Sequence, residues 1–304
     1  MKYVFIVNLQ ARDGELKQLW QAAEPRISSE VSNMEVCYPQ SALETLQLAR
    51  EYADRGGYCI VSVGGEGTMN LVMQSIMDSA RRDDTVMALV PFGNVNDYAS
   101  TLGMEKNWQS AIQTLLHGQE MRVGVTELLT PESSNYALNM ADIGFGASTA
   151  KLHSVDRKLR WVKGQLKYNL LALRALISWK NIPCKVHLDD ELIDGDVALV
   201  LAGNSPTLGG FRVLPHATVD SEQLAVTICR DVSRLQLMAV LEDSKRSRLK
   251  ESDRVMFRHA SRLRVEPEGA FVTQVDGEIT NLKANRVEFI AHPQVLRFMA
   301  PMEI

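Results

Sequence analysis

The sequence has few residues of the kinds that cross-link a protein or anchor it in a membrane. Its four cysteines, Cys37, Cys59, Cys184 and Cys229, stand singly among 304 residues, so no two have the spacing of a zinc site or a disulfide framework. Isolated cysteines are typical of a reducing compartment. No apolar run reaches the ~20 residues that span a bilayer, and the first apolar run is too short for a signal peptide. We therefore expect a cytoplasmic protein.

The charge is small overall but unevenly placed. The net charge of -4 conceals two basic stretches: residues 151–180 carry eight Lys/Arg against one acid, and residues 245–264 carry eight against two. Such stretches are usually solvated surface, but they also attract anionic membranes or phosphate groups. We expect no nucleic-acid partner, and the sequence does not indicate an oligomeric state.

The pattern of apolar residues changes near residue 124. Before it, strand-like runs at 3–8, 58–63 and 86–90 alternate with amphipathic stretches such as 41–54, which predicts a doubly wound α/β domain with a mostly parallel sheet. After it, short strand-like runs dominate, interrupted by one long helical stretch over 155–179. We predict an α/β domain over 1–124 and a β-rich, β-sandwich domain over 125–304, with the last residues packing back on the first domain. The predicted strands of the second domain are 136–141, 185–188, 197–202, 224–229, 262–266, 271–275 and 287–291.

Two glycine-containing turns follow neighbouring predicted strands. The first is the run Val-Gly-Gly-Glu-Gly-Thr-Met-Asn at residues 63–70, and the second is Pro-Phe-Gly-Asn-Val-Asn-Asp-Tyr-Ala at residues 91–99. Glycines let a backbone approach a phosphate closely, and a helix N-terminus favours an anion. A tight turn without a ligand uses the same residues, but ligands of open α/β sheets bind at the carboxyl ends of the strands. Two such turns therefore indicate a phosphate site. It is not a Walker loop, because the spacing and the lysine are absent.

Both motifs resemble those of the diacylglycerol kinase catalytic family, whose pattern is GGDGTxNE followed by PxGTxNDFA. This chain has GGEGTMNL and PFGNVNDYA. The family includes bacterial lipid kinases and is related to sphingosine kinases and NAD kinases. The resemblance continues, in the same order, at residues 161–168, 201–217 and 275–278, so it covers nearly the whole chain. These later segments favour the lipid-kinase branch.

The resemblance implies an ATP-dependent kinase that transfers the γ-phosphate to a hydroxyl of a diacylglycerol-like lipid, with Mg²⁺ as cofactor. It implies that Asp276 is the catalytic base, that Glu66 is a second catalytic residue, and that both are candidate ligands of Mg²⁺. On sequence chemistry alone, Asp276-Gly277 is equally typical of a hairpin turn. The implied nucleotide-binding residues are Asn8, Gly64, Gly65, Gly67, Thr68, Asn70, Gly93, Asn94, Asn96, Asp97 and Glu278.

The chain departs from the family pattern at several positions. Glu66 stands in place of Asp, Asn94 in place of Thr, and Leu71 in place of Glu. The family's DGxLD segment, which builds an accessory magnesium site in bacterial members, aligns here with Ser221 and Ala225 in place of its aspartates. Asp220 and Glu222 are the candidate substitutes. Two alternatives therefore stay open: a catalytically degenerate nucleotide- or lipid-binding protein, and a kinase for a soluble acceptor such as NAD.

A lipid substrate implies contact with a membrane surface. The basic stretch 151–180 contains Trp161 and Trp179, which are residues typical of membrane interfaces. We expect reversible, peripheral docking at the inner membrane face through this stretch. The basic residues expected to dock are Arg157, Lys158, Arg160, Lys163 and Lys167.

Overall fold

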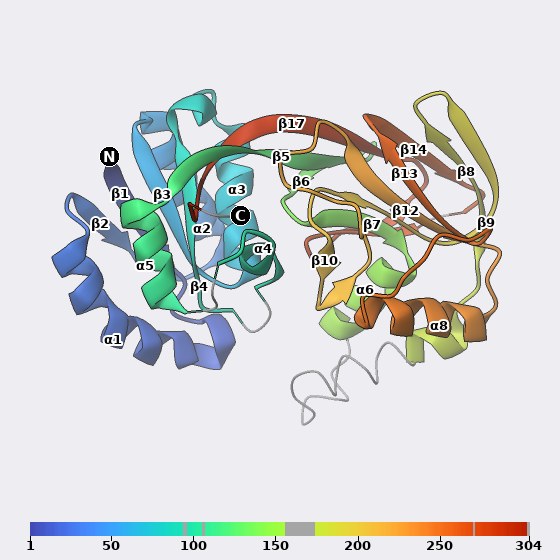
Figure 1. Cartoon of the computed structure of the whole chain (residues 1–304), viewed down its shortest axis with the longest axis horizontal. Helices are drawn as coiled ribbons and strands as arrows, with labels where there is room; N and C mark the ends of the chain where they lie inside the picture. The colour runs from blue at the N-terminus through green and yellow to red at the C-terminus, as the bar shows by residue number, and fades with distance from the viewer. Residues whose placement is uncertain (94–95, 105–106, 156–173, 270, 303–304) are drawn as a thin grey trace. The chain divides into compact units, whose positions relative to one another are not determined.

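The computed structural model describes residues 1–93, 96–104, 107–155, 174–269 and 271–302 (Figure 1). The chain divides into two compact units, Met1–Val125 with Pro293–Ile304, and Thr126–His292. The division falls beside the junction expected from the sequence, and residues 293–304 belong with the first unit.

The first unit is built on a parallel sheet. Strand β1 (Lys2–Val7) lies between β2 (Met34–Cys37) and β3 (Tyr58–Gly64), and β4 (Val86–Pro91) pairs with β3. All these pairings are parallel. Every residue of β4 is buried, as expected for a strand covered on both faces. The continuous apolar runs of the sequence thus became the centre of the sheet.

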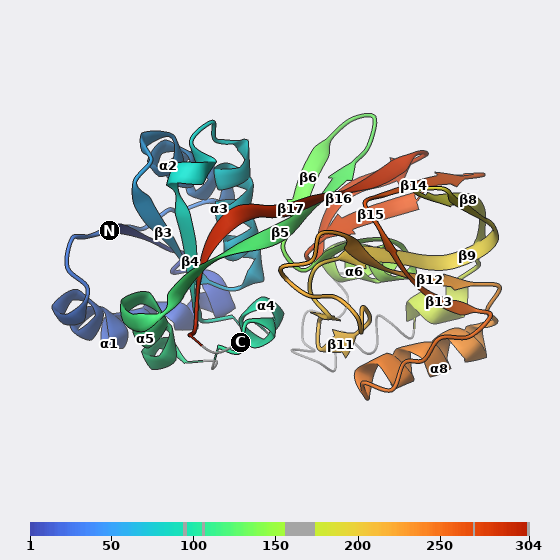
Figure 2. The same cartoon turned by 45° about the horizontal axis from the view of Figure 1, so that its top comes forward.

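Helices cover both faces of this sheet. Helices α2 and α3 pack together on one face, while α1 and α5 lie on the other (Figures 1 and 2). Two of these helices begin at a side-chain cap: Ser41 accepts a hydrogen bond from the Glu44 amide at the start of α2, and Asn107 accepts one from the Ser110 amide at the start of α5. The helices are α1 (Glu15–Glu30), α2 (Ala42–Arg55), α3 (Glu66–Asp78), α4 (Asp97–Thr101) and α5 (Trp108–His117).

The end of the chain completes the first unit. Strand β17 (Val287–Ala300) pairs in parallel with β4 at Arg297 and Phe298. The Phe298 ring is fully buried and packs edge-on against the Tyr98 ring of α4, with 5.4 Å between the ring centroids. The last strand therefore fixes α4 beside the carboxyl end of β4.

The second unit is an antiparallel β structure. Its strands follow the order β16-β15-β7-β9-β8-β14-β17, with β12 and β13 joined through β9, and β6 joined to β5. One apolar core lies among the strands, and a second lies between β7, β9 and β12 and the helices α6 and α8 (Figure 1). The strands are β5 (Gln119–Leu129), β6 (Ser134–Ala137), β7 (Met140–Gly144), β8 (Ile182–Leu188), β9 (Glu191–Gly203), β10 (Thr207–Leu208), β11 (Phe211–Arg212), β12 (Leu224–Arg230), β13 (Val255–Ala260), β14 (Arg262–Pro267), β15 (Phe271–Val275) and β16 (Glu278–Ala284). The helices are α6 (Phe145–Val155), residues 174–178 and α8 (Arg234–Lys245).

The predicted fold class, an α/β domain followed by a β-sandwich domain, is confirmed, but some element boundaries were wrong. The single strand predicted over 136–141 is two strands, β6 and β7, which are interrupted at Leu138 and Asn139. The amides of those two residues donate to the Asp276 carboxylate in place of a strand partner. Helices α6 and α8 and strands β10, β11, β13 and β16 were missed. Most of the helix predicted over 155–179 falls in residues 156–173, outside the described residues.

Candidate functional site

The first glycine turn joins β3 to α3. A Cβ atom built on Gly64 would lie 2.5 Å from the Thr68 hydroxyl oxygen, so only glycine fits there. Gly65 is the N-cap residue of α3 and has no side chain with which to cap it. The N-cap side chain therefore cannot accept hydrogen bonds from the first-turn amides of α3. An anion bound at this helix N-terminus could accept them, and the helix dipole favours such an anion. Gly67 lies in the same first turn.

The second turn joins β4 to α4. Asn96, the N-cap residue of α4, has the left-handed φ of 54°, and its side-chain amide donates to the Gly93 carbonyl at 2.8 Å. That bond closes the turn. Asn96 and Asp97 are both buried. Asn94, also predicted as a site residue, lies outside the described residues.

The two turns are in direct contact. The Phe92 amide donates to the Gly64 carbonyl at 3.0 Å, and the Asp97 amide donates to the Glu66 carboxylate at 3.0 Å. A small pocket at this edge of the sheet is lined by residues from both turns, among them Gly64, Gly65, Glu66, Pro91, Asn96 and Tyr98. The structure thus brings the two predicted motifs together in one site.

A third strand end supports the first turn. Asn8, directly after β1, donates from its side-chain amide to the Thr68 hydroxyl at 3.0 Å. The Thr68 side chain is buried and folded toward β1 rather than capping its own helix. Asn70 is also buried, and its side-chain carbonyl accepts a hydrogen bond from Gln74. Asn8 and Thr68 therefore support the first turn from the end of β1.

Asp276 lies in the second unit, in the turn between β15 and β16. Its carboxylate accepts three backbone hydrogen bonds, from the amides of Leu138 at 3.0 Å, Asn139 at 2.9 Å and Met140 at 3.1 Å. The side chain is buried, and the residue has the left-handed φ of 49°. These donors stabilise the charged carboxylate and fix its orientation. Asp276 therefore joins its own turn to residues 138–140, which gives it a structural role. Its catalytic role stays a prediction. Glu278, at the start of β16, is exposed.

A second carboxyl group on the same strand pair was missed by the sequence reasoning. Asp142 of β7 is paired with Gln274 of β15, whose side-chain amide donates to it. Burial raises the pKa of the Asp142 carboxyl to about 7, although hydrogen bonds from Gln274 and the Ala147 amide oppose that rise. A Cβ atom on Gly146 would lie 2.5 Å from an Asp142 carboxylate oxygen, so the glycine leaves room for this acid. The signal in the sequence was an Asp inside an otherwise apolar strand.

The described residues form no group of three His, Cys, Asp or Glu side chains suited to a metal ion. Asp220 and Glu222, the candidate substitutes in the accessory segment, are exposed, and Ser221 closes its own turn through a 2.7 Å bond to the Gln223 carbonyl. A protein-only metal centre is therefore not formed by this part of the chain. Magnesium commonly binds through one or two carboxylates plus substrate phosphates, and Glu66 is compatible with that mode.

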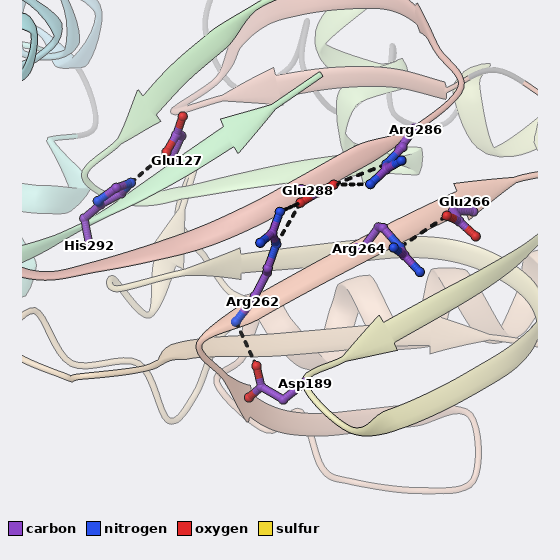
Figure 3. Close-up of polar contacts among 8 residues, drawn as sticks. All are labelled: Glu127, Asp189, Arg262, Arg264, Glu266, Arg286, Glu288 and His292. Carbon is purple, nitrogen blue, oxygen red and sulfur yellow. Dashed lines mark hydrogen bonds and ion pairs between the residues drawn. The ribbon is translucent and has the colours of Figure 1, made fainter. Parts of the chain in front are cut away.

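A separate polar network lies on β14 and β17 (Figure 3). The Glu288 carboxylate lies between Arg262 and Arg286, which both donate to it, while Arg264 pairs with Glu266 at 3.2 Å. Burial disfavours the charged form of Glu288, but the two arginines outweigh burial, so the pKa of its carboxyl lies below the usual value. Asp189 accepts from the Arg262 amide, and His292 pairs with Glu127. Arg262, Arg264 and Arg286 each pair with a carboxylate of the sheet, so we interpret this network as structural.

No helix of the described chain is both long and apolar enough to cross a membrane.

Two family models match the chain. Residues 2–128 match the diacylglycerol kinase catalytic domain, and residues 141–300 match the YegS C-terminal NAD kinase beta sandwich-like domain. Together they confirm the resemblance seen in the motifs. The second match alone covers more than half of the chain.

Curated and solved relatives agree with these models. The chain is 24% identical over 220 residues to a diacylglycerol kinase of Staphylococcus saprophyticus, covering 72% of this chain and 70% of that one. It is 26% identical over 234 residues to a "Probable lipid kinase YegS-like" protein of Chromohalobacter salexigens, covering 77% and 73%. A crystal structure of a diacylglycerol kinase from Bacillus anthracis superposes with a TM-score of 0.74 at 17% identity, covering 98% and 96%, and shows the shared fold. The chain therefore belongs to the diacylglycerol kinase family, with an N-terminal catalytic domain followed by a YegS-type β-sandwich domain.

Proposed function

We propose that the protein is an ATP-dependent lipid kinase that transfers the γ-phosphoryl group to a hydroxyl of a diacylglycerol-like lipid. The observation that carries the proposal is the contact between the two glycine turns at the starts of α3 and α4. The N-terminus of α3 supplies amide donors and a favourable dipole to phosphate groups, and the turn before α4 packs against it. The proposal is also supported by membership of the kinase family.

The first unit supplies the binding of phosphate. Because Gly64 and Gly65 have no side chains, the first turn packs closely against Thr68 at the start of α3 and against Gly93, and Asn96 keeps the neighbouring turn closed. Magnesium, when bound with the nucleotide, would neutralise phosphate charge, and Glu66 is the carboxylate placed to hold it. Phosphoryl transfer needs mainly positioning and charge stabilisation, which a rigid backbone cradle provides.

Asp276 is the proposed acceptor of the lipid hydroxyl proton. Its three amide donors keep the carboxylate charged and oriented, which suits a group that positions a hydroxyl by accepting its hydrogen bond. These amides occupy lone pairs that the lipid hydroxyl would also use. Asp276 would therefore act mainly by orienting the hydroxyl and less by removing its proton.

One observation favours a second candidate, a nucleotide- or lipid-binding protein without turnover. The Glu66 carboxylate already accepts the Asp97 amide, and the Asp276 carboxylate already accepts three amides. Both carboxylates therefore have a structural task that does not require catalysis.

The test is transfer of γ-labelled phosphate from ATP to a panel of detergent-dispersed acceptors: diacylglycerol, phosphatidylglycerol, a sphingoid base and NAD. We expect a labelled lipid product that requires Mg²⁺. Gly65→Val should abolish both the product and the thermal stabilisation by ATP, because the branched side chain fills the space facing Gly93. Gly269→Val is the control, since Gly269 has open space around it. Stabilisation by ATP without any product would favour the binding protein, and labelled NAD alone would favour the soluble acceptor.

A further inference from the structure

Helix α8 presents large apolar side chains to water. Leu235 is 74% exposed and Met238 is 47% exposed, at the i and i+3 positions of one helix face. The opposite face fills the core, where Leu237 is fully buried. The buried face therefore holds the helix on the unit. Packing against the core does not explain why the outer face carries large apolar side chains.

A neighbouring segment adds to the same region. The Arg234 guanidinium donates to the Trp179 carbonyl at 3.1 Å, and the Asn181 side-chain amide donates to the Val232 carbonyl at 2.9 Å. These bonds hold the end of the helical residues 174–178 beside the start of α8. Ile177 in that segment is 65% exposed. Scattered exposed apolar residues are ordinary, but three large ones on adjoining segments indicate a contact surface.

Cations follow the apolar residues along the helix. Lys245, Arg246, Arg248 and Lys250 are all exposed at the end of α8 and just beyond it. Arg246 pairs with Glu242 at 2.6 Å, and within the described residues no ion pair is recorded for Lys245, Arg248 or Lys250. Residues 242–250 carry these four cations against two acids, Glu242 and Asp243, so the end of α8 has a local charge of +2. Exposed apolar side chains beside a net positive charge favour contact with an anionic membrane interface.

We propose that this face, defined by Ile177, Leu235, Met238, Lys245, Arg248 and Lys250, docks the protein on an anionic lipid bilayer. The apolar side chains enter the headgroup boundary, and the cations are drawn to acidic lipids. A second copy of the chain is a poorer occupant, because a symmetric pairing would set like-charged patches against each other. The inference rests on the proposed function, because a lipid kinase must bind the membrane that holds its substrate. Membrane binding is measured without phosphoryl transfer, so it can be tested separately.

The test is co-sedimentation with vesicles of phosphatidylglycerol and phosphatidylcholine, compared with vesicles of phosphatidylcholine alone. Leu235→Glu should lower the partition coefficient on anionic vesicles by about tenfold or more, since it replaces an inserting side chain with a repelled one. Leu43→Glu is the matched control: Leu43 is 64% exposed and, like Leu235, is the second residue of its helix. Both variants change the net charge equally, so the control should stay within about twofold of the wild type.

A second variant tests the cations. Lys245→Gln/Arg248→Gln/Lys250→Gln should weaken binding to anionic vesicles and reduce its dependence on salt. All variants should keep the wild-type melting temperature, because the altered side chains face water, and should keep activity on detergent-dispersed substrate.

Equal vesicle binding by Leu235→Glu and the wild type would overturn the proposal. A wild type that does not bind vesicles but dissociates from dimer to monomer on Leu235→Glu would overturn it in favour of a face between copies. A melting temperature lowered by Leu235→Glu but not by Leu43→Glu would show that the face is covered within the chain. Failure of catalysis on every acceptor would leave the vesicle result standing, so the two proposals fail separately.

Discussion

The backbone of Gly93 lies against the backbone of Gly65, so that a Cβ atom built on Gly93 would stand 2.7 Å from the Gly65 Cα atom. The same Cβ atom would stand 2.4 Å from the Asn96 side-chain oxygen. Two turns that follow different strands therefore depend on each other for their shape. The glycines are needed first for this packing and, through it, for the phosphate cradle that we propose.

The two glycines should respond differently to alanine. Gly93→Ala should lower the free energy of unfolding by ~1–3 kcal/mol, because the added carbon has no room between the turns. Gly65→Ala should change it by less than ~1 kcal/mol, since its nearest neighbour would be 3.4 Å away. Urea unfolding measures both. Equal losses in the two variants would contradict the packing described here.

Glu66 joins the two turns because its carboxylate accepts a hydrogen bond from the Asp97 amide. A neutral side chain could accept the same bond, so substitution can test the structural role of Glu66 apart from its charge. Glu66→Gln keeps an acceptor, so its melting temperature should stay near that of the wild type while phosphoryl transfer falls by ~10²-fold, if the carboxylate helps to hold magnesium. Glu66→Asp should lose the contact with Asp97 and about 1 kcal/mol of stability. If Glu66→Gln retains full transfer, Glu66 is a connecting residue only. If the wild type is inactive and Glu66→Asp phosphorylates a lipid, the protein is a catalytically degenerate member of the family.

Asp276→Asn should affect both stability and chemistry. An amide has only one oxygen to accept the three backbone donors, so we expect a loss of ~1–3 kcal/mol in the free energy of unfolding. Transfer should fall by ~10²-fold or more at a temperature where the variant is folded, while the thermal shift with ATP remains. Transfer that survives in the folded variant would exclude Asp276 as the group that positions the hydroxyl.

The Glu288 network gives an acid-dependent prediction. Because the pKa of Glu288 is lower in the folded chain than in the unfolded chain, its contribution is present above the unfolded pKa and is lost as the pH falls through the folded pKa. Glu288→Gln should cost ~1–3 kcal/mol at pH 7 and less near pH 3. Glu266→Gln is the control, because its more exposed pair with Arg264 should contribute only ~0–1 kcal/mol. A pH-independent effect of Glu288→Gln would contradict this account.

Asp142 gives the opposite dependence. Its pKa is raised to about 7 in the folded chain, so folding favours the protonated acid, and stability should fall as the pH rises from about 4 toward 7. Asp142→Asn should remove that slope and should be relatively more stable than the wild type at pH 8 than at pH 5. Parallel pH profiles for the two proteins would show that Asp142 is not buried in the uncharged form.

The elements that were predicted correctly are those whose signals are local. The strand expected at 271–275 is β15 without change, and the continuous apolar runs before each glycine turn gave β3 and β4. The break between β6 and β7 was not predictable in this way, because it depends on Asp276, a residue 136 to 138 positions further along the chain. Helix α8 was missed although Ser233 and Gln236 form a capping box at its start, since its apolar residues are split between two faces.

In the candidate site, too, the features with local sequence signals were predicted and the contacts between distant residues were not. The motifs predicted that Gly64, Gly65 and Gly93 belong to one edge of the sheet, because parallel strands end together. They did not predict that Glu66 bonds the Asp97 amide or that Asn8 supports Thr68, since those contacts depend on side-chain direction in the folded unit. Asp142 was overlooked because a single acid in an apolar strand carries no spacing signal.

The most direct test of the central claim is amide hydrogen exchange with and without ATP and Mg²⁺. If the packed turns hold the nucleotide phosphates, the amides of residues 64–68 at the start of α3 should exchange more slowly when ATP is bound, and those of residues 92–97 should respond with them. The protection should disappear in Gly65→Val and persist in Gly269→Val. Binding of ATP without any protection at either turn would contradict the account, because the phosphates would then lie elsewhere.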